Sequence, residues 1–587
     1  MRKLASALLI ALTLPLSTYA GDEKDAYSGR NFWYYDKTDR IKIFQSLMDS
    51  IEIDYALLPI KEDRLGINFQ KLNAETLAFE ESLTQEEDSF EQAKSNIRFI
   101  DRVKAYIAKF EDTHFAIGTT TPMPVIYTGL RFFEVGDKIV VSSLDAKLLA
   151  YNATRSSTPD FKKIAIGDEL VKVDGKPVAK AIDELSSFIA ASSKGFNRML
   201  AVNGLGIRRY NFPNKNYVDF TFASGQTLRF PLYYSTAGID ARPDTTFFFK
   251  KLGYINDKSV ELNWDAAKKD WAESTPSYAG YSASTIAPLL TDVKNYSSKQ
   301  SGVVIRTGFF AKGDAKYGVL QLTTFVESTV KDPETNQDRA FLDVIGQFIS
   351  ELKSKNLPLI FDLRNNNGGN GRFPPAVLSF LTEAGKVYAN RTSGYKITEY
   401  MRQLQEPDFF KDFPAGTISS SGITDDQFME MFQTAINERA TYTPMFSTND
   451  IEMNATVGGY EQKIVALVTP NCVSACDNMI NLLKSSKRAI LVGTHSNGTG
   501  AGFSSDSRLN TQWTDPRHVL STTFPNYIFG VPGGAPGEYI FEKDSAWKLC
   551  SENRPHQADI FYTTQMVDLM NSNKGWFEKA AEVLEQN

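Results

Sequence analysis

Ser474 stands at the point where a predicted buried strand gives way to a predicted helix. Residues 463–468 form a largely apolar run that predicts the strand, and apolar side chains recur at helical spacing over residues 479–483. A hydroxyl at such a turn lies near the positive end of a helix dipole, where an alkoxide and a developing oxyanion are both stabilised. Ser474 with Asp477 three residues later also fits a helix-capping pattern, and taken alone the serine favours that structural role.

A second segment could supply the electrostatic part of acyl-transfer chemistry. Residues 357–362 predict another buried strand, which continues through Leu-Arg-Asn-Asn-Asn into Gly368 and Gly369. Glycines in a turn present bare backbone N–H groups, and such groups can form an oxyanion hole. The pair of segments therefore shifts the interpretation of Ser474 from a helix cap toward a nucleophile.

These two segments resemble the C-terminal-processing protease family, whose members pair a D-L-R-x-N-x-G-G segment with a later S-A-S-A-S-E segment that holds the nucleophile. Residues 361–369 match the first motif, and Cys472-Val473-Ser474-Ala475-Cys476-Asp477 falls on the second. The resemblance spans most of the chain and implies a mixed α/β multidomain fold with a core of the ClpP/crotonase-like type. It implies that Ser474 is the nucleophile and that the N–H of Ala475 joins Gly368 or Gly369 in the oxyanion hole.

The general base differs from that of the bacterial tail-specific branch, which uses a lysine in a G-K-G segment. Here Thr499 occupies that position. The resemblance to the tricorn-like branch implies instead that His114 is the base, preceded by Thr113 where that branch has serine, and that Thr113 helps to hold the imidazole. It also implies that Glu552 orients the imidazole, because residues 551–560 resemble the family's C-terminal E-N-x-G-V-x-P-D ending without its glycine. His495, in a glycine-rich loop after Ser474, is the competing base.

The same resemblance bears on the cysteines. The chain has three, Cys472, Cys476 and Cys550. If Ser474 and Glu552 share a site, Cys550 lies near the other two, and a Cys472–Cys550 or Cys476–Cys550 bridge is a hypothesis. With four histidines and no HExxH or CxxC pattern, the sequence predicts no metal site and no cofactor.

The elements that would position these residues fall into separate regions. Helical periodicity runs from Asp39 to about Phe110, and residues 166–178 resemble the core of a PDZ domain, although a hairpin with an Asp-Gly turn explains them locally. Strands and helices alternate from Tyr317 onward, which predicts an α/β core. The predicted organisation is a signal peptide (1–20), a helical domain that ends in the histidine motif (21–123), a PDZ-like domain (124–236), a linker or insertion (237–316), and the protease core (317–587) with an insertion at about 387–460.

Composition limits the partners. A formal net charge of −6 gives no basic field for nucleic acid, and the mature chain has no apolar stretch long enough to predict stable membrane insertion. The first twenty residues have the charged, apolar, small-residue order of a signal peptide cleaved after Ala20, which predicts a periplasmic or extracellular protein.

The combined prediction is an exported serine endopeptidase that acts on protein or peptide substrates. An exported peptide-binding protein with an inactive protease core is the alternative, motivated by the missing lysine and the imperfect ending around Glu552. A binding protein for small apolar ligands is a third, weaker interpretation. The sequence predicts neither the substrate nor the oligomeric state.

Overall fold

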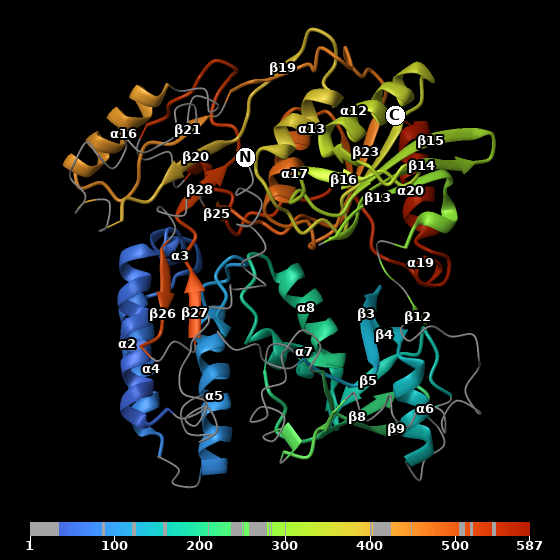
Figure 1. Cartoon of the computed structure of the whole chain (residues 1–587). Helices are drawn as coiled ribbons and strands as arrows, with labels where there is room; N and C mark the ends of the chain where they lie inside the picture. The colour runs from blue at the N-terminus through green and yellow to red at the C-terminus, as the bar shows by residue number, and fades with distance from the viewer. Residues whose placement is uncertain are drawn as a thin grey trace.

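The structure is a computed structural model of the chain. It describes residues 35–84, 89–119, 125–155, 161, 163–208, 211–235, 249–250, 252–256, 279–280, 282, 285–299, 301–398, 402, 424–447, 449–503, 511–516, 520–542 and 548–586. The predicted signal peptide, 1–20, lies outside these residues. No helix within the described ranges is long and apolar enough to cross a membrane. The protein has the mixed α/β multidomain architecture expected from the sequence (Figure 1).

Four helices open the described chain, α2 (Lys37–Asp54), α3 (Leu58–Leu65), α4 (Phe69–Ser82) and α5 (Ser89–Ala108). Asp36 and Asn68 cap α2 and α4 by accepting backbone N–H bonds of 2.7 Å and 2.8 Å. The hairpin of β26 (Gln512–Thr514) and β27 (Leu520–Thr523) lies alongside these helices (Figure 1). β1 (Gly118–Thr119) pairs with β27, so the first part of the chain is joined to a segment about 400 residues later.

The middle of the chain forms small, mainly antiparallel sheets together with several short helices. One sheet has the order β6-β5-β8-β9. Asp174 and Gly175 form its tight turn with φ of 50° and 78°, as the Asp-Gly pair predicts. The elements of this unit that matter below are β5 (Leu170–Val173), β6 (Lys176–Pro177), α7 (Val178–Ser186), α8 (Lys194–Gly206), β8 (Tyr217–Phe222) and β9 (Thr227–Pro231).

The core is a nine-stranded sheet. In spatial order its strands are β17 (Asp338–Ala340), β16 (Thr329–Lys331), β13 (Thr291–Ser298), β14 (Gly302–Lys312), β15 (Ala315–Leu322), β18 (Leu359–Asp362), β23 (Ile464–Val468), β24 (Ile490–Gly493) and β29 (Ile560–Phe561). From β15 to β29 the strands are parallel. Parallel strands require crossover connections, and helices α12 (Phe341–Ser354) and α17 (Ala475–Ser485) provide two of them.

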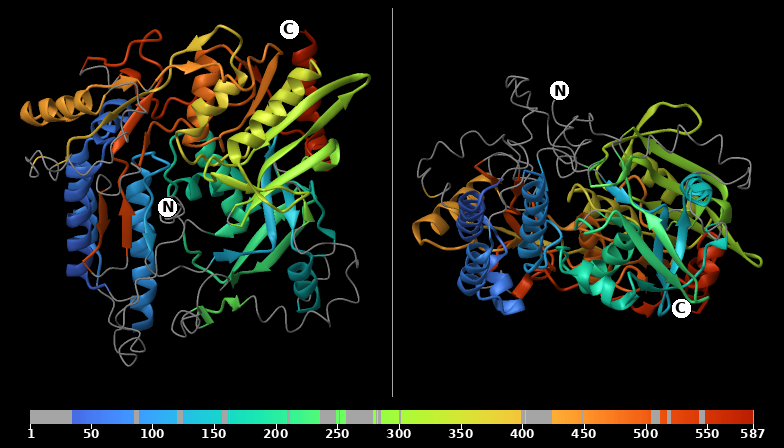
Figure 2. Two further views of the ribbon diagram at one scale, coloured as in Figure 1. Left: turned by 45° about the horizontal axis from the view of Figure 1, so that its top comes forward. Right: turned by 90° about the horizontal axis from the view of Figure 1, so that it is seen from below.

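Helices cover both faces of this sheet. Alternate residues of β18 show the pattern, since Phe361 packs in the cluster that includes α12, α13 (Phe373–Leu381) and α17, whereas Ile360 packs in the cluster of α20 (Lys574–Gln586). Figure 2 shows α20 and the α12 side of the sheet from two further directions. The carboxyl ends of the parallel strands thus form one edge, at which both predicted catalytic segments begin.

The structure differs from the sequence analysis between residues 285 and 316. β13 and β14 belong to the nine-stranded sheet, whereas the sequence analysis placed 237–316 in a linker or insertion. β13 reads Thr-Asp-Val-Lys-Asn-Tyr-Ser-Ser and is mostly exposed or half-buried, so it lacks the apolar alternation that marks a strand in a sequence. The predicted insertion at 387–460 supplies β20 (Thr392–Tyr395), which pairs with β28 (Tyr527–Gly530) in a separate sheet.

Candidate active site

Ser474 follows the carboxyl end of β23 and is the residue immediately before α17. Its backbone has φ 60° and ψ −116°, a conformation that non-glycine residues rarely adopt and that costs roughly 1–3 kcal/mol. The Ser474 side chain makes no capping hydrogen bond to α17. Asp477 accepts instead from the N–H groups of Gly498 and Thr499, at 2.9 Å and 3.1 Å. The capping interpretation of Ser474 is therefore not what the structure shows.

The glycine turn lies directly against Ser474. A Cβ atom on Gly368 would stand 2.4 Å from the Val473 carbonyl oxygen and 2.8 Å from the Ser474 Cβ, so only glycine fits. Asn366 joins the two segments, because its carbonyl accepts from Val473 N at 3.1 Å and its side chain accepts from Gly368 N at 2.8 Å.

That last bond bears on the predicted oxyanion hole. The Gly368 N–H is already used by the Asn366 side chain. Within the described chain, the N–H groups of Gly369 and Ala475 donate to no protein acceptor. Ala475 is the first residue of α17, so its N–H has no acceptor within the helix. The backbone N–H groups of Gly369 and Ala475 are therefore the ones near Ser474 that can still bind an oxyanion.

A disulfide brackets the serine. Cys472 and Cys476 are bonded to each other, with a Cα–Cα distance of 5.1 Å, and Cys550 is a buried free thiol. The hypothesis of a bridge to Cys550 is therefore wrong. Cys550 Sγ lies 3.5 Å from the Gly500 carbonyl oxygen, and burial raises its pKa to about 11, which keeps it a thiol.

His114 lies in the segment after α5, where its backbone N–H donates to Asp112 at 2.9 Å. Its ring packs edge-on against Phe503, with ring centres 5.4 Å apart. Burial lowers the imidazole pKa, while the Glu552 charge and a backbone hydrogen bond with Ala501 oppose this shift. Among the described residues, no partner is hydrogen-bonded to His114 Nδ1. The ring is therefore neutral near pH 7 and able to accept a proton.

Thr113 connects the histidine segment to the serine segment. Its hydroxyl donates to Asn497 Oδ1 at 2.8 Å, and the same oxygen accepts from the Thr499 hydroxyl at 2.9 Å. The Thr499 hydroxyl in turn lies 3.3 Å from Ser474 N. Thr113 also exchanges two hydrogen bonds with Ser192, so its bonds hold the backbone around His114 rather than the imidazole that the sequence analysis assigned to it.

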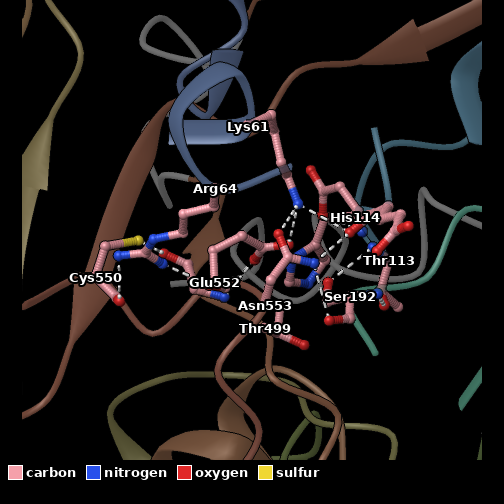
Figure 3. A network of polar contacts seen from close by, with 12 residues as sticks. Lys61, Arg64, Thr113, His114, Ser192, Thr499, Cys550, Glu552 and Asn553 are labelled. Carbon is pink, nitrogen blue, oxygen red and sulfur yellow. Dashed lines mark hydrogen bonds and ion pairs between the residues drawn. The ribbon is translucent and has the colours of Figure 1, made fainter. Parts of the chain in front are cut away.

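Glu552 is fully buried and bound through both carboxylate oxygens (Figure 3). Oε1 accepts from Lys61 Nζ at 2.6 Å, and Oε2 accepts from Gly500 N at 2.6 Å. Burial raises the pKa of Glu552, Lys61 lowers it, and the nearby Asp112 raises it. Glu552 therefore acts on His114 through its charge, which raises the histidine pKa, and its hydrogen bonds go to other groups.

His495, the competing base, is engaged elsewhere. Its Nδ1 lies 2.6 Å from the Ser496 carbonyl oxygen, and its ring packs against Gly195 at the start of α8, where an added Cβ would stand 2.3 Å from Nε2. No cluster of metal-ligating side chains occurs in the described ranges. Sequence reasoning missed Lys61 and Asn497, because a single lysine in an amphipathic helix and a single asparagine in a glycine-rich loop carry no distinguishing pattern.

Comparison with known proteins supports the catalytic interpretation. The model of peptidase family S41 matches residues 316–525, which include the segments of Gly368 and Ser474. A protein of Chlamydia trachomatis serovar D is 22% identical over 450 residues, covering 64% of this chain and 71% of that protein. Mature CPAF complexed with lactacystin has a similar fold, with a TM-score of 0.62 and 16% identity over 94% of this chain and 98% of that one. Another structure of mature CPAF, also at 0.62 and 16%, covers 93% and 96%. The match to peptidase family S41 covers residues 316–525, and the protein is a serine-type peptidase.

Proposed function

We propose that the protein is an exported serine endopeptidase in which Ser474 is the nucleophile and His114 the general base. One observation carries this assignment most directly. The Ser474 turn is strained, its side chain makes no capping hydrogen bond, and it lies against Gly368 and the available N–H of Ala475. A chain of hydrogen bonds through Thr499 and Asn497 connects this turn to the histidine segment.

The reaction is acyl transfer. Ser474 Oγ attacks the carbonyl carbon of a peptide bond while His114 accepts the hydroxyl proton, and the N–H groups of Ala475 and Gly369 receive the oxyanion. The C–N bond then breaks, and the imidazolium protonates the departing amine. Water, deprotonated by His114, hydrolyses the acyl-Ser474 ester and restores the hydroxyl. The negative charge of Glu552 stabilises the imidazolium that forms in each half.

The remaining proposals concern substrate and compartment. The antiparallel unit around β5 and α7 is proposed as a PDZ-like domain that binds an extended peptide by strand addition. The order of residues 1–20 and the Cys472–Cys476 disulfide support export to a periplasm or the exterior, because disulfides persist in oxidising compartments.

The test is hydrolysis of casein by the chain from Gly21, together with labelling by a serine-reactive phosphonate. Ser474→Ala and His114→Ala are expected to lower the hydrolysis rate by about 1,000-fold or more, because nucleophile and base act as a unit. Ser474→Ala is also expected to abolish labelling, whereas His495→Ala is expected to keep both casein hydrolysis and labelling. Lactacystin, bound in the similar structure of mature CPAF, provides a second probe. Hydrolysis that survives Ser474→Ala would contradict the assignment of the nucleophile.

A further inference from the structure

Lys61 is a fully buried lysine whose ammonium lies in the candidate active site (Figure 3). Its Nζ contacts Glu552 Oε1 at 2.6 Å, Asn553 Oδ1 at 2.7 Å and the Glu111 carbonyl oxygen at 2.8 Å. An ammonium has three donors, so these acceptors saturate it. Burying such a pair costs several kcal/mol per ion, and a buried ion pair is therefore weak evidence for stabilisation. A contribution to stability therefore does not by itself explain why Lys61 is buried beside Glu552 with all three donors used.

The acceptors of Lys61 are the groups that flank the proposed base and its carboxylate. Glu111, whose φ is 45°, lies three residues before His114, and Asn553 directly follows Glu552. The Asn553 side chain also donates to the carbonyls of Glu111 and Ser192, at 3.0 Å each. Lys61 thus connects α3 to both the histidine segment and the Glu552 segment at a single point.

Several charged or titratable groups surround this carboxylate. Lys61 on α3 donates to it, and Asp112 and Tyr55 approach from the N-terminal helices, where the Tyr55 hydroxyl donates to Asp112 at 2.9 Å. Arg64, also on α3, donates to the backbone carbonyls of Glu552 and Cys550, at 2.5 Å and 3.1 Å. His114 and the Cys550 thiol complete the set. Without the ammonium of Lys61, Glu552 would face the negative charge of Asp112 in a buried site.

We propose that Lys61 is a positioning residue, which keeps Glu552 ionised and fixed beside His114 so that the carboxylate supports the imidazolium during catalysis. This inference rests on the proposed function and adds a residue to it. Lys61 touches neither Ser474 nor His114, so it acts through Glu552 and through the Glu111 carbonyl.

The inference predicts a particular pH dependence. Glu552 already has a raised pKa because it is buried, and Lys61 is the main group that lowers it. In Lys61→Met the carboxyl becomes protonated at neutral pH and no longer stabilises the imidazolium. Raising the pH ionises it again and restores activity, whereas a variant that merely loosens the fold gains nothing at higher pH.

The experiment measures the rate at which the phosphonate labels Ser474 between about pH 6 and pH 9, for the wild type, Lys61→Met, Glu552→Gln and the double variant. Lys61→Met is expected to lose about 10- to 100-fold near pH 7 and to recover most of this toward pH 9. The double variant labels no more slowly than Glu552→Gln alone, because both changes remove one effect. Lys396→Met is the matched control, since Lys396 is also buried but donates to the backbone carbonyls of Tyr55 and Glu52.

The outcomes separate two failures. If the phosphonate does not label Ser474 in the wild type, the proposed function is wrong, and the inference about Lys61 is then wrong as well. If the wild type labels but Lys61→Met has a pH profile parallel to that of the wild type or of Lys396→Met, the inference about Lys61 alone is overturned. Losses that multiply in the double variant would also overturn it.

Discussion

At the scale of single residues, the site depends on close approaches that few side chains permit. Gly368 lies so close to Ser474 that an added Cβ would stand 2.8 Å from the Ser474 Cβ, and its φ of 85° also favours glycine. The sequence led to this neighbourhood through the family resemblance, which implied that Gly368 or Gly369 joins the N–H of Ala475 in an oxyanion hole beside Ser474. It did not predict that Asn366 would occupy the Gly368 N–H, since such a bond depends on a side-chain rotamer.

Gly368→Ala is expected to lower kcat by about 100-fold or more, because the new Cβ must displace the Val473 carbonyl and the Ser474 side chain together. Gly385→Ala is the control. Gly385 has a similar φ of 73°, yet an added Cβ there meets no atom within 4 Å. It should lose on the order of 1 kcal/mol of stability and keep its activity. Casein hydrolysis and thermal unfolding of both variants check this, and equal activity losses would argue against the contact.

At the scale of elements, the sequence predicted the strands and helices with a strong period. The segments at residues 357–362 and 463–468 are present as β18 and β23, and the alternation of strands and helices predicted from Tyr317 onward is seen in β15, α12 and β18. β13 was missed because it is mostly polar and exposed or half-buried, so it shows no apolar alternation, whereas β14 is apolar and buried but lies in the region that was assigned to a linker or insertion. The sequence also did not predict which cysteines form the disulfide, because the pairing depends on how tightly the chain turns at Ser474.

The Cys472–Cys476 disulfide constrains the turn between β23 and α17, and it closes a loop of only a few residues. Loop-closure entropy for so short a loop corresponds to about 2 kcal/mol of stability. Reductant is therefore expected to lower the free energy of unfolding of the wild type by about this amount, and to lower the labelling rate of Ser474 because the strained turn loses a constraint.

Two variants control that measurement. The double variant Cys472→Ala, Cys476→Ala should match the reduced wild type and show no response to reductant. Cys550→Ala should respond as the wild type does, because Cys550 is a free thiol outside the bridge. A response to reductant that persists in the double variant would show that the disulfide is not its source.

At the scale of the whole molecule, the site is assembled from segments far apart in the chain. Lys61 and Glu552 are 491 residues apart, and the pairing of β1 with β27 and the hydrogen bond from Trp513 to Ser46 join the same two ends of the chain. The sequence predicts the roles of Ser474 and His114 through the family resemblance, and these roles stay predictions. It could not predict Lys61, because long-range contacts between a helix and a loop leave no local pattern.

The pH dependence of global stability tests how buried groups act together. Asp101, Asp145 and Asp477 are buried carboxyls whose pKa is raised to about 6, so the folded state binds protons more tightly than the unfolded state does. Each therefore adds stability as the pH falls below about 6. His556 acts in the opposite direction, since burial and the Lys484 charge lower its pKa from 6.5 to about 4. Its stabilising contribution is complete above pH 6.5 and is lost as the pH falls toward 4.

His556→Gln isolates that contribution. Between about pH 7.5 and about pH 5, protonation of His556 in the unfolded state is expected to cost the wild type roughly 2 kcal/mol that the variant does not lose. The free energy of unfolding of His556→Gln, measured relative to the wild type in denaturant at both pH values, should therefore rise by roughly this amount at the lower pH. A difference between the two proteins that is the same at both pH values would mean that His556 is not held neutral by the fold, and the packing of the 551–560 segment beside Glu552 would then be looser than the structure indicates.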